Sequence, residues 1–198
     1  MNYLTKRRQN ITQKLCSTKR LVKMNIFFLH LIPSICAKMH VDRHVVKMTL
    51  ETCQMLCTVW HVSDPDHKIY EPPYKLAHKN HPCTIWARAS IDNYNWLCQL
   101  GLELCKEYTY RYGKTHACEK HIISLSEQTP PIPDIGFTIP AQAMPDVYKI
   151  ENTVEIESVI DAYHAFYFFE KNHFLSWKGK IAGRDEPQWI TVIRDLFD

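Results

Sequence analysis

Apolar residues recur at helical spacing in three long stretches of the chain, which predicts a mainly α protein. The pattern places helices over about residues 34–61, 82–112 and 154–177. Pro82 is a favoured first-turn residue for the second helix, and Gly113 is expected to end it. We therefore expect a single compact helical domain.

Two non-helical stretches accompany these helices. The apolar run Ile26–Ile32 predicts a short buried strand or extended segment that stops at Pro33, after which Ser34 would cap the first helix. Between the second and third helices, prolines recur over residues 130–145 and keep the chain extended. Because residues 137–149 are apolar, we expect an ordered loop across the domain rather than a free linker.

One face of the first predicted helix carries titratable groups. Four of them recur at spacings of four, three and four, which stacks them in one row beside an apolar stripe: His40, His44, Lys47 and Glu51. Such a row can transfer protons or bind an anion or a metal, since histidine titrates near neutral pH. The alternative is a solvent-facing row with an ordinary surface ion pair between Lys47 and Glu51.

The net charge of +3 is unevenly distributed along the 198 residues. Residues 1–23 contain seven lysines and arginines and no acid, so they carry +7 and leave −4 on residues 24–198. We expect residues 1–23 to be a disordered basic arm that can bind nucleic acid or an anionic surface, and residues 24–198 to be the helical domain. The alternative is a solvated extension, which a second translation start at Met24 would remove.

The eight cysteines and the longest apolar run indicate in which cellular compartment the protein is expected. No C-x-x-C pair is present, and Cys53 and Cys57 sit at helical spacing within an apolar pattern, so core thiols in a reducing compartment are expected. The run Ile26–Ile32 is far too short to span a bilayer. These features predict a cytoplasmic protein without a membrane segment.

A second polar cluster lies just before the helix predicted to begin at Pro82. It consists of His78, Lys79, Asn80 and His81. Unpaired N–H groups at a helix start favour negative charge, so the cluster is a candidate phosphate or carboxylate site. The alternative is a capped helix start in which Asn80 or His81 is only the cap.

Four further polar residues are candidates for the site. Asn93, Glu107 and Arg111 lie on the otherwise apolar side of the second predicted helix, and Gln142 lies in the apolar loop segment. We assign Glu107 to the catalytic group and the other three to substrate binding. For Asn93, a satisfied hydrogen bond in the core is the alternative.

Metal binding is a separate alternative. His40 and His44 have the spacing of zinc-binding helices, but Val41 stands where the H-E-x-x-H motif has its glutamate, so that motif is absent. Further ligands would have to come from the set His78, His81, Glu107 and His116. We predict no metal ligands and no cofactor, and keep a divalent ion as the alternative.

Several separated motifs resemble a family of small proteins encoded by tailed bacteriophages and by giant, mimivirus-like DNA viruses. The motifs are MNIFFL at 24–29, HVDRHVVKMTLETCQML at 40–56, KNHPCTIWAR at 79–88, EYTYRYGK at 107–114 and AQAMPD at 141–146. The resemblance spans residues 24–177 and leaves the basic arm outside. It implies a viral protein, in the host cytoplasm or the virion.

The apolar segment followed by a His-bearing helix also resembles, more distantly, the small helical pyrimidine-dimer DNA glycosylases. That resemblance implies an N-terminal amine that attacks the sugar carbon, assisted by a glutamate on the helix. This chain departs from the pattern, because a Met-Asn start keeps its methionine and residues 24–198 are acidic. Lys47 could replace the amine as a Schiff-base nucleophile, with Glu51 or Glu107 moving protons.

The sequence thus predicts an enzyme that acts on DNA, a nucleotide or another phosphate-bearing substrate by acid/base chemistry. We expect His40 and His44 to act as acid/base groups or ligands, and Lys47 and Lys79 to bind the anion or carbonyl. Glu51 would orient them. The alternatives are a non-catalytic nucleic-acid-binding or packaging protein and a metal-dependent hydrolase.

Overall fold

The computed structural model describes residues 24–197, so the predicted basic arm lies outside the described residues. Within them the chain forms seven α-helices and one 3₁₀ helix and contains no strand, which confirms a mainly α protein. The helices are α2 (Pro33–Met39), α3 (Asp42–Ser63), α4 (Pro82–Ala87), α5 (Ile91–Tyr112), α6 (Glu119–Ser126), α7 (Ile156–Lys171), η1 (Asn172–Phe174) and α8 (Gln188–Phe197).

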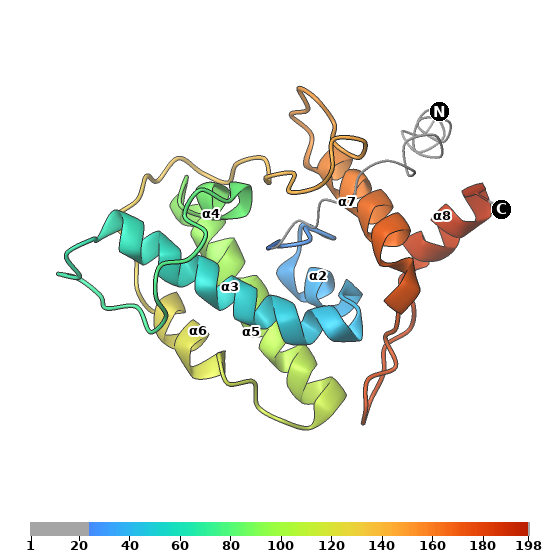
Figure 1. Ribbon diagram of the computed structural model, residues 1–198, viewed down its shortest axis with the longest axis horizontal. Helices are drawn as coiled ribbons and strands as arrows, with labels where there is room; N and C mark the ends of the chain where they lie inside the picture. Colours follow the sequence, from blue (N-terminus) through green and yellow to red (C-terminus); the bar gives the residue numbers. More distant parts are fainter. Residues whose placement is uncertain (1–23, 198) are drawn as a thin grey trace.

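The two 22-residue helices α3 and α5 pack against each other and form the centre of one layer. The short helices α4 and α6 lie at the edges of this pair, and α2 lies between the pair and the C-terminal helices α7 and α8 (Figure 1). A long loop, residues 127–155, crosses from α6 to α7 along one edge of the molecule (Figure 1). It is the ordered loop that the sequence predicted.

The first predicted helix is broken in two, because α2 ends at Met39 and α3 begins at Asp42. His40 and Val41 have extended backbone, with ψ angles of 134° and 158°. The break frees carbonyl groups, and the Arg111 guanidinium donates to the carbonyls of His40 and Lys38 at 2.8 and 2.9 Å. The partner that makes the break tolerable is thus 71 residues away in the chain.

The other predicted boundaries differ in detail. Ser34 is not the cap of the first helix, because Ile32 occupies that position and Pro33 begins the helix. The second predicted helix is divided into α4 and α5, and Gly113 ends α5 in the left-handed region at φ 65°, as predicted. The third is shorter than predicted and ends in η1, and the sequence did not predict α6 or α8.

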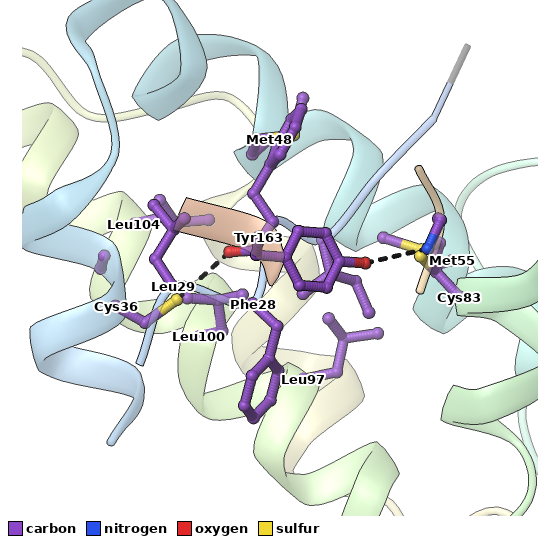
Figure 2. Packing of buried hydrophobic residues seen from close by; sticks show 14 of the residues in the cluster. Phe28, Leu29, Cys36, Met48, Met55, Cys83, Leu97, Leu100, Leu104 and Tyr163 are labelled. Carbon is purple, nitrogen blue, oxygen red and sulfur yellow. Dashed lines mark hydrogen bonds between the residues drawn. The ribbon is translucent and has the colours of Figure 1, made fainter. Parts of the chain in front are cut away.

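The segment predicted over residues 26–32 is buried only as far as Leu29, since Leu31 and Ile32 are 40% and 51% exposed. It has no strand pairing, and Phe27 lies in the left-handed region at φ 50°. Figure 2 shows Phe28 and Leu29 of this segment in the core beside Met48 of α3, Leu97 of α5 and Tyr163 of α7. The segment therefore passes between the α3–α5 pair and α7.

A buried segment without a strand partner must hydrogen-bond its backbone to side chains. His164 lies 2.8 Å from the Leu29 carbonyl, and the Cys36 thiol donates to the Phe27 carbonyl at 3.5 Å. Seven buried cysteines are free thiols in the described part of the chain: Cys36, Cys53, Cys57, Cys83, Cys98, Cys105 and Cys118.

Candidate active site

A cavity of about 250 Å³ lies where the extended segment, the start of α3 and the end of α7 meet. Nine residues line it: Met24, Asn25, Phe27, Arg43, His44, Lys47, Glu51, Lys171 and Phe174. Three residues of the row predicted on the first helix therefore share one cavity. They are His44, Lys47 and Glu51.

Lys47 and Glu51 form an ion pair one helical turn apart, with 3.1 Å between Nζ and Oε1. The two ends of the pair differ in exposure, because the Lys47 side chain is 57% exposed and the Glu51 side chain only 9%. The other carboxylate oxygen of Glu51 accepts the backbone N–H of Asn25 at 3.0 Å. Burial raises the pKa of Glu51, although the hydrogen bond from Asn25 and the charge of Lys47 oppose the increase.

His44 lies deeper in the cavity, stacked on Phe27 with 4.5 Å between the ring centroids. The Tyr167 hydroxyl accepts the Val41 N–H at 3.0 Å, so its own proton is directed to His44 Nδ1, 2.7 Å away. This assigns the imidazole proton of His44 to Nε2. Burial lowers the pKa of His44 to about 2, so the ring is a neutral hydrogen-bond donor near pH 7 rather than a cation.

Two cations that the sequence did not single out complete the wall. The Arg43 guanidinium lies 5.4 Å from the Phe174 ring centroid, and Lys171 Nζ lies 5.3 Å from that of Phe166 and 5.8 Å from that of Phe27. Arg43 precedes Lys47 by four residues, and this spacing was a usable sequence signal. No local pattern links Lys171 to α3, because the two are more than 100 residues apart.

The cavity is therefore electropositive. Arg43, Lys47 and Lys171 face a single carboxylate, that of Glu51, and His44 is neutral. Lys47 is the only one of these cations with a carboxylate within ion-pair distance among residues 24–197. An anionic group such as a phosphate would be attracted to this wall.

The residues 78–81 lie beside the cavity but do not line it. His81 caps α4, since its Nδ1 accepts the N–H of Cys83 at 3.2 Å, and it also hydrogen-bonds the Met24 backbone. His78, Lys79 and Asn80 are exposed, and the Lys79 carbonyl accepts from Arg88. Substrate binding by these residues stays a prediction.

His40 lies in the break between α2 and α3 and is completely buried. Its Nδ1 is 2.8 Å from the Cys36 carbonyl and its Nε2 is 3.2 Å from the Ile26 carbonyl. Burial lowers its pKa to about 4, so the ring is neutral and donates to only one of these two carbonyls at a time. His40 does not line the cavity.

Glu107 and Arg111 belong to a buried ion cluster away from the cavity. Arg111 Nε donates to Glu107 at 3.1 Å and its Nη1 donates to Asp42 at 3.1 Å, while Arg184 Nη2 donates to the other Glu107 oxygen at 2.7 Å. The predicted catalytic role of Glu107 and binding role of Arg111 are therefore not supported by proximity to the other candidates.

Asn93 and Gln142 hold loop segments in place. Asn93 Nδ2 donates to the Trp86 carbonyl at 2.8 Å, and its Oδ1 accepts the Thr138 N–H at 2.9 Å. Gln142 makes a similar two-sided contact with the backbone of Ile150. Both residues lie outside the cavity lining.

Residues 24–197 contain neither a side-chain cluster suited to a metal ion nor a helix suited to cross a membrane. No group of three or more His, Cys, Asp or Glu side chains in residues 24–197 is arranged to hold a metal ion. In the same part of the chain, every helix is too short or too polar to cross a membrane.

Comparisons with known proteins add one match. Residues 24–120 match the model of a family described as pyrimidine dimer DNA glycosylase. The match covers just under half of the chain and contains all the cavity residues except Lys171 and Phe174. No curated protein and no solved structure matches the chain.

The match supports the glycosylase resemblance drawn from the sequence. A viral origin and a cytoplasmic location stay predictions. Over residues 24–120, the chain is similar to the pyrimidine dimer DNA glycosylase family, which suggests a role on DNA.

Proposed function

We propose that the protein is a DNA-processing enzyme of the glycosylase/lyase type, in which an amine of the cavity attacks a sugar carbon and Glu51 moves protons. The observation that carries this proposal is the placement of Glu51. Its buried carboxylate lies in an electropositive cavity, between the Lys47 ammonium and the Asn25 N–H. This cavity is built largely from the segment that matches the glycosylase family.

The chemistry needs an unprotonated amine and a group that exchanges protons. The amine lone pair forms a bond to C1′ of the damaged nucleotide, and the bond from C1′ to the base breaks as the base takes up a proton. At an abasic site, the amine instead adds to the C1′ aldehyde and water leaves. Glu51 is suited to supply and remove these protons, because burial raises its pKa towards neutral pH.

The cations would hold the DNA backbone. Arg43 and Lys171 extend the positive wall beyond the Lys47–Glu51 pair. Contacts between such side chains and phosphates position DNA without reading its sequence. His44, as a neutral Nε2–H donor, is suited to hydrogen-bond a sugar or phosphate oxygen.

In the family, the resemblance implies a chain-terminal amine as the nucleophile. The corresponding nitrogen here is that of Asn25, which lies 3.0 Å from Glu51 but belongs to the peptide bond with Met24. A peptide nitrogen has no free lone pair for attack. The proposal therefore assigns the attack to a side-chain amine of the cavity rather than to the Asn25 nitrogen.

The test is borohydride trapping on a duplex oligonucleotide that contains one abasic site, with an ultraviolet-irradiated duplex in parallel. Borohydride reduces the imine between enzyme and sugar, so a covalent protein–DNA band is expected. Glu51→Gln should lower the trapping rate by about 100-fold, the usual contribution of a general acid/base. Glu103→Gln is the matched control, because Glu103 is a carboxylate on α5 outside the cavity, 21% exposed and paired with the exposed Lys106.

A failure to trap any adduct or cleave either duplex would overturn the proposal. If the protein then still bound DNA in a gel-shift assay, the non-catalytic binding protein would be the correct alternative. Trapping that is equally fast in Glu51→Gln and in the intact protein would leave a lyase activity but refute the role of Glu51.

A further inference from the structure

Lys171 is the last residue of α7 and reaches the cavity from outside the segment that matches the glycosylase family. Its Nζ lies over two aromatic rings, those of Phe166 and Phe27. Phe27 is also the ring on which His44 stacks, so the amine and the imidazole share one aromatic wall. Lys171 therefore belongs to the same site as the α3 row.

The two lysines of the cavity are in opposite electrostatic situations. Lys47 is paired with Glu51 at 3.1 Å, and more than half of its side chain is exposed. Lys171 is half-buried, and no carboxylate lies within ion-pair distance of it among residues 24–197. A lysine that attacks a sugar carbon must first lose its proton, which favours Lys171 over Lys47.

The surroundings of Lys171 disfavour its charge. Burial lowers the pKa of Lys171, and the positive charge of Lys47 lowers it further, although Glu170 on the same helix acts in the opposite direction. A desolvated lysine beside a second cation is a recognised way to obtain a nucleophilic amine near neutral pH. The aromatic rings attract the cation and offset part of this effect.

We infer that Lys171 is the amine that forms the Schiff base, and that Lys47 and Glu51 act as its proton-exchanging partner pair; this inference rests on the function proposed above. The Lys171 lone pair forms the C–N bond to C1′. The base, or water from an abasic aldehyde, leaves with a proton from Glu51. With the intact nucleotide, Glu51 then takes one amine proton and returns it to O4′ as the C1′–O4′ bond of the sugar ring breaks and the nitrogen lone pair forms the C1′=N bond. Both routes give a protonated Schiff base, which borohydride reduces in the trapped product.

The experiment is trapping with the same abasic duplex, followed by protease digestion and mass spectrometry to locate the modified residue. The intact protein should carry the reduced adduct on Lys171. Lys171→Arg keeps the positive charge but cannot form an imine, so its trapping should fall at least 100-fold. Lys120→Arg, at an exposed position on α6, is the matched control and should trap normally.

A DNA-binding measurement distinguishes a Lys171 that acts as the nucleophile from a Lys171 that only contacts a phosphate. Lys171→Arg should bind a duplex with a tetrahydrofuran analogue, which has no aldehyde, within about twofold of the intact protein, since a charge-retaining substitution preserves the phosphate contact. Strong trapping of Lys171→Arg, or an adduct on Lys47 or on the chain terminus, overturns the inference and leaves the proposed function standing. Absence of any adduct in the intact protein overturns both.

Discussion

Replacing Glu107 by glutamine tests whether this residue is structural. The Glu107 side chain is 5% exposed and accepts hydrogen bonds from Arg111, which is completely buried, and from Arg184. The substitution removes the negative charge and leaves Asp42, 15% exposed, as the nearest acidic partner of Arg111. After the substitution, the buried Arg111 guanidinium therefore has one carboxylate partner, Asp42, in place of two.

The size of the effect follows from this geometry. Breaking a buried ion pair from one side costs roughly 3–5 kcal/mol, because the remaining charge stays desolvated. The glutamine oxygen can still accept one hydrogen bond and Asp42 remains 3.1 Å from Arg111, so we expect the lower end, about 3 kcal/mol. With a urea m-value of roughly 2 kcal/mol/M, the unfolding midpoint should fall by about 1.5 M.

Urea unfolding followed by circular dichroism measures this change. Glu103→Gln is the control on the same helix, since its partner Lys106 is 70% exposed and such pairs contribute less than about 1 kcal/mol. At a temperature where Glu107→Gln is folded, its DNA trapping should equal that of the intact protein. Unchanged stability together with lost trapping would refute this reasoning and restore the catalytic role predicted from the sequence.

Two further predictions concern buried polar groups outside the cavity lining. Tyr167→Phe removes the acceptor of the Val41 N–H and the donor to His44, so the free energy of unfolding should fall by about 1–3 kcal/mol, and an unchanged melting temperature would contradict this. His40 and His164 have pKa values of about 4 when folded and 6.5 when unfolded, so their stabilising effect is complete above pH 6.5 and is lost as the pH falls towards 4. The free energy of unfolding, measured by urea titration, should fall by about 2 kcal/mol for each histidine between neutral pH and pH 5. A urea midpoint that rises with acidification would exclude the neutral buried rings.

The sequence predicted what depends on local periodicity. The row on the first helix placed His44, Lys47 and Glu51 on one face, and they line one cavity in the structure. The glycine after the second helix was also predicted correctly, because the left-handed conformation at Gly113 has a local signature.

The sequence could not predict the surroundings of His40 and Glu107, because these depend on contacts with residues far away in the chain. His40 has the same periodicity as the rest of the row, but it lies in the break between α2 and α3, which Arg111 from α5 stabilises. Glu107 looked like a site residue because it interrupts an apolar face. In the structure Glu107 instead accepts a hydrogen bond from Arg184, which lies 77 residues further along the chain.

The division of the cavity wall between two parts of the chain has a consequence for its chemistry. In the proposed function the α3 row supplies the acid/base pair, but by itself it presents an ion pair between residues four apart on a helix. The end of α7 changes that environment. Tyr167 fixes the proton of His44, and one turn later Lys171 adds an amine that has no carboxylate within ion-pair distance among the described residues 24–197. Because these two residues are four apart on one helix, docking of α7 sets both at once. The distinction between a surface ion pair and a reactive site therefore depends on α7, outside the segment that matches the glycosylase family.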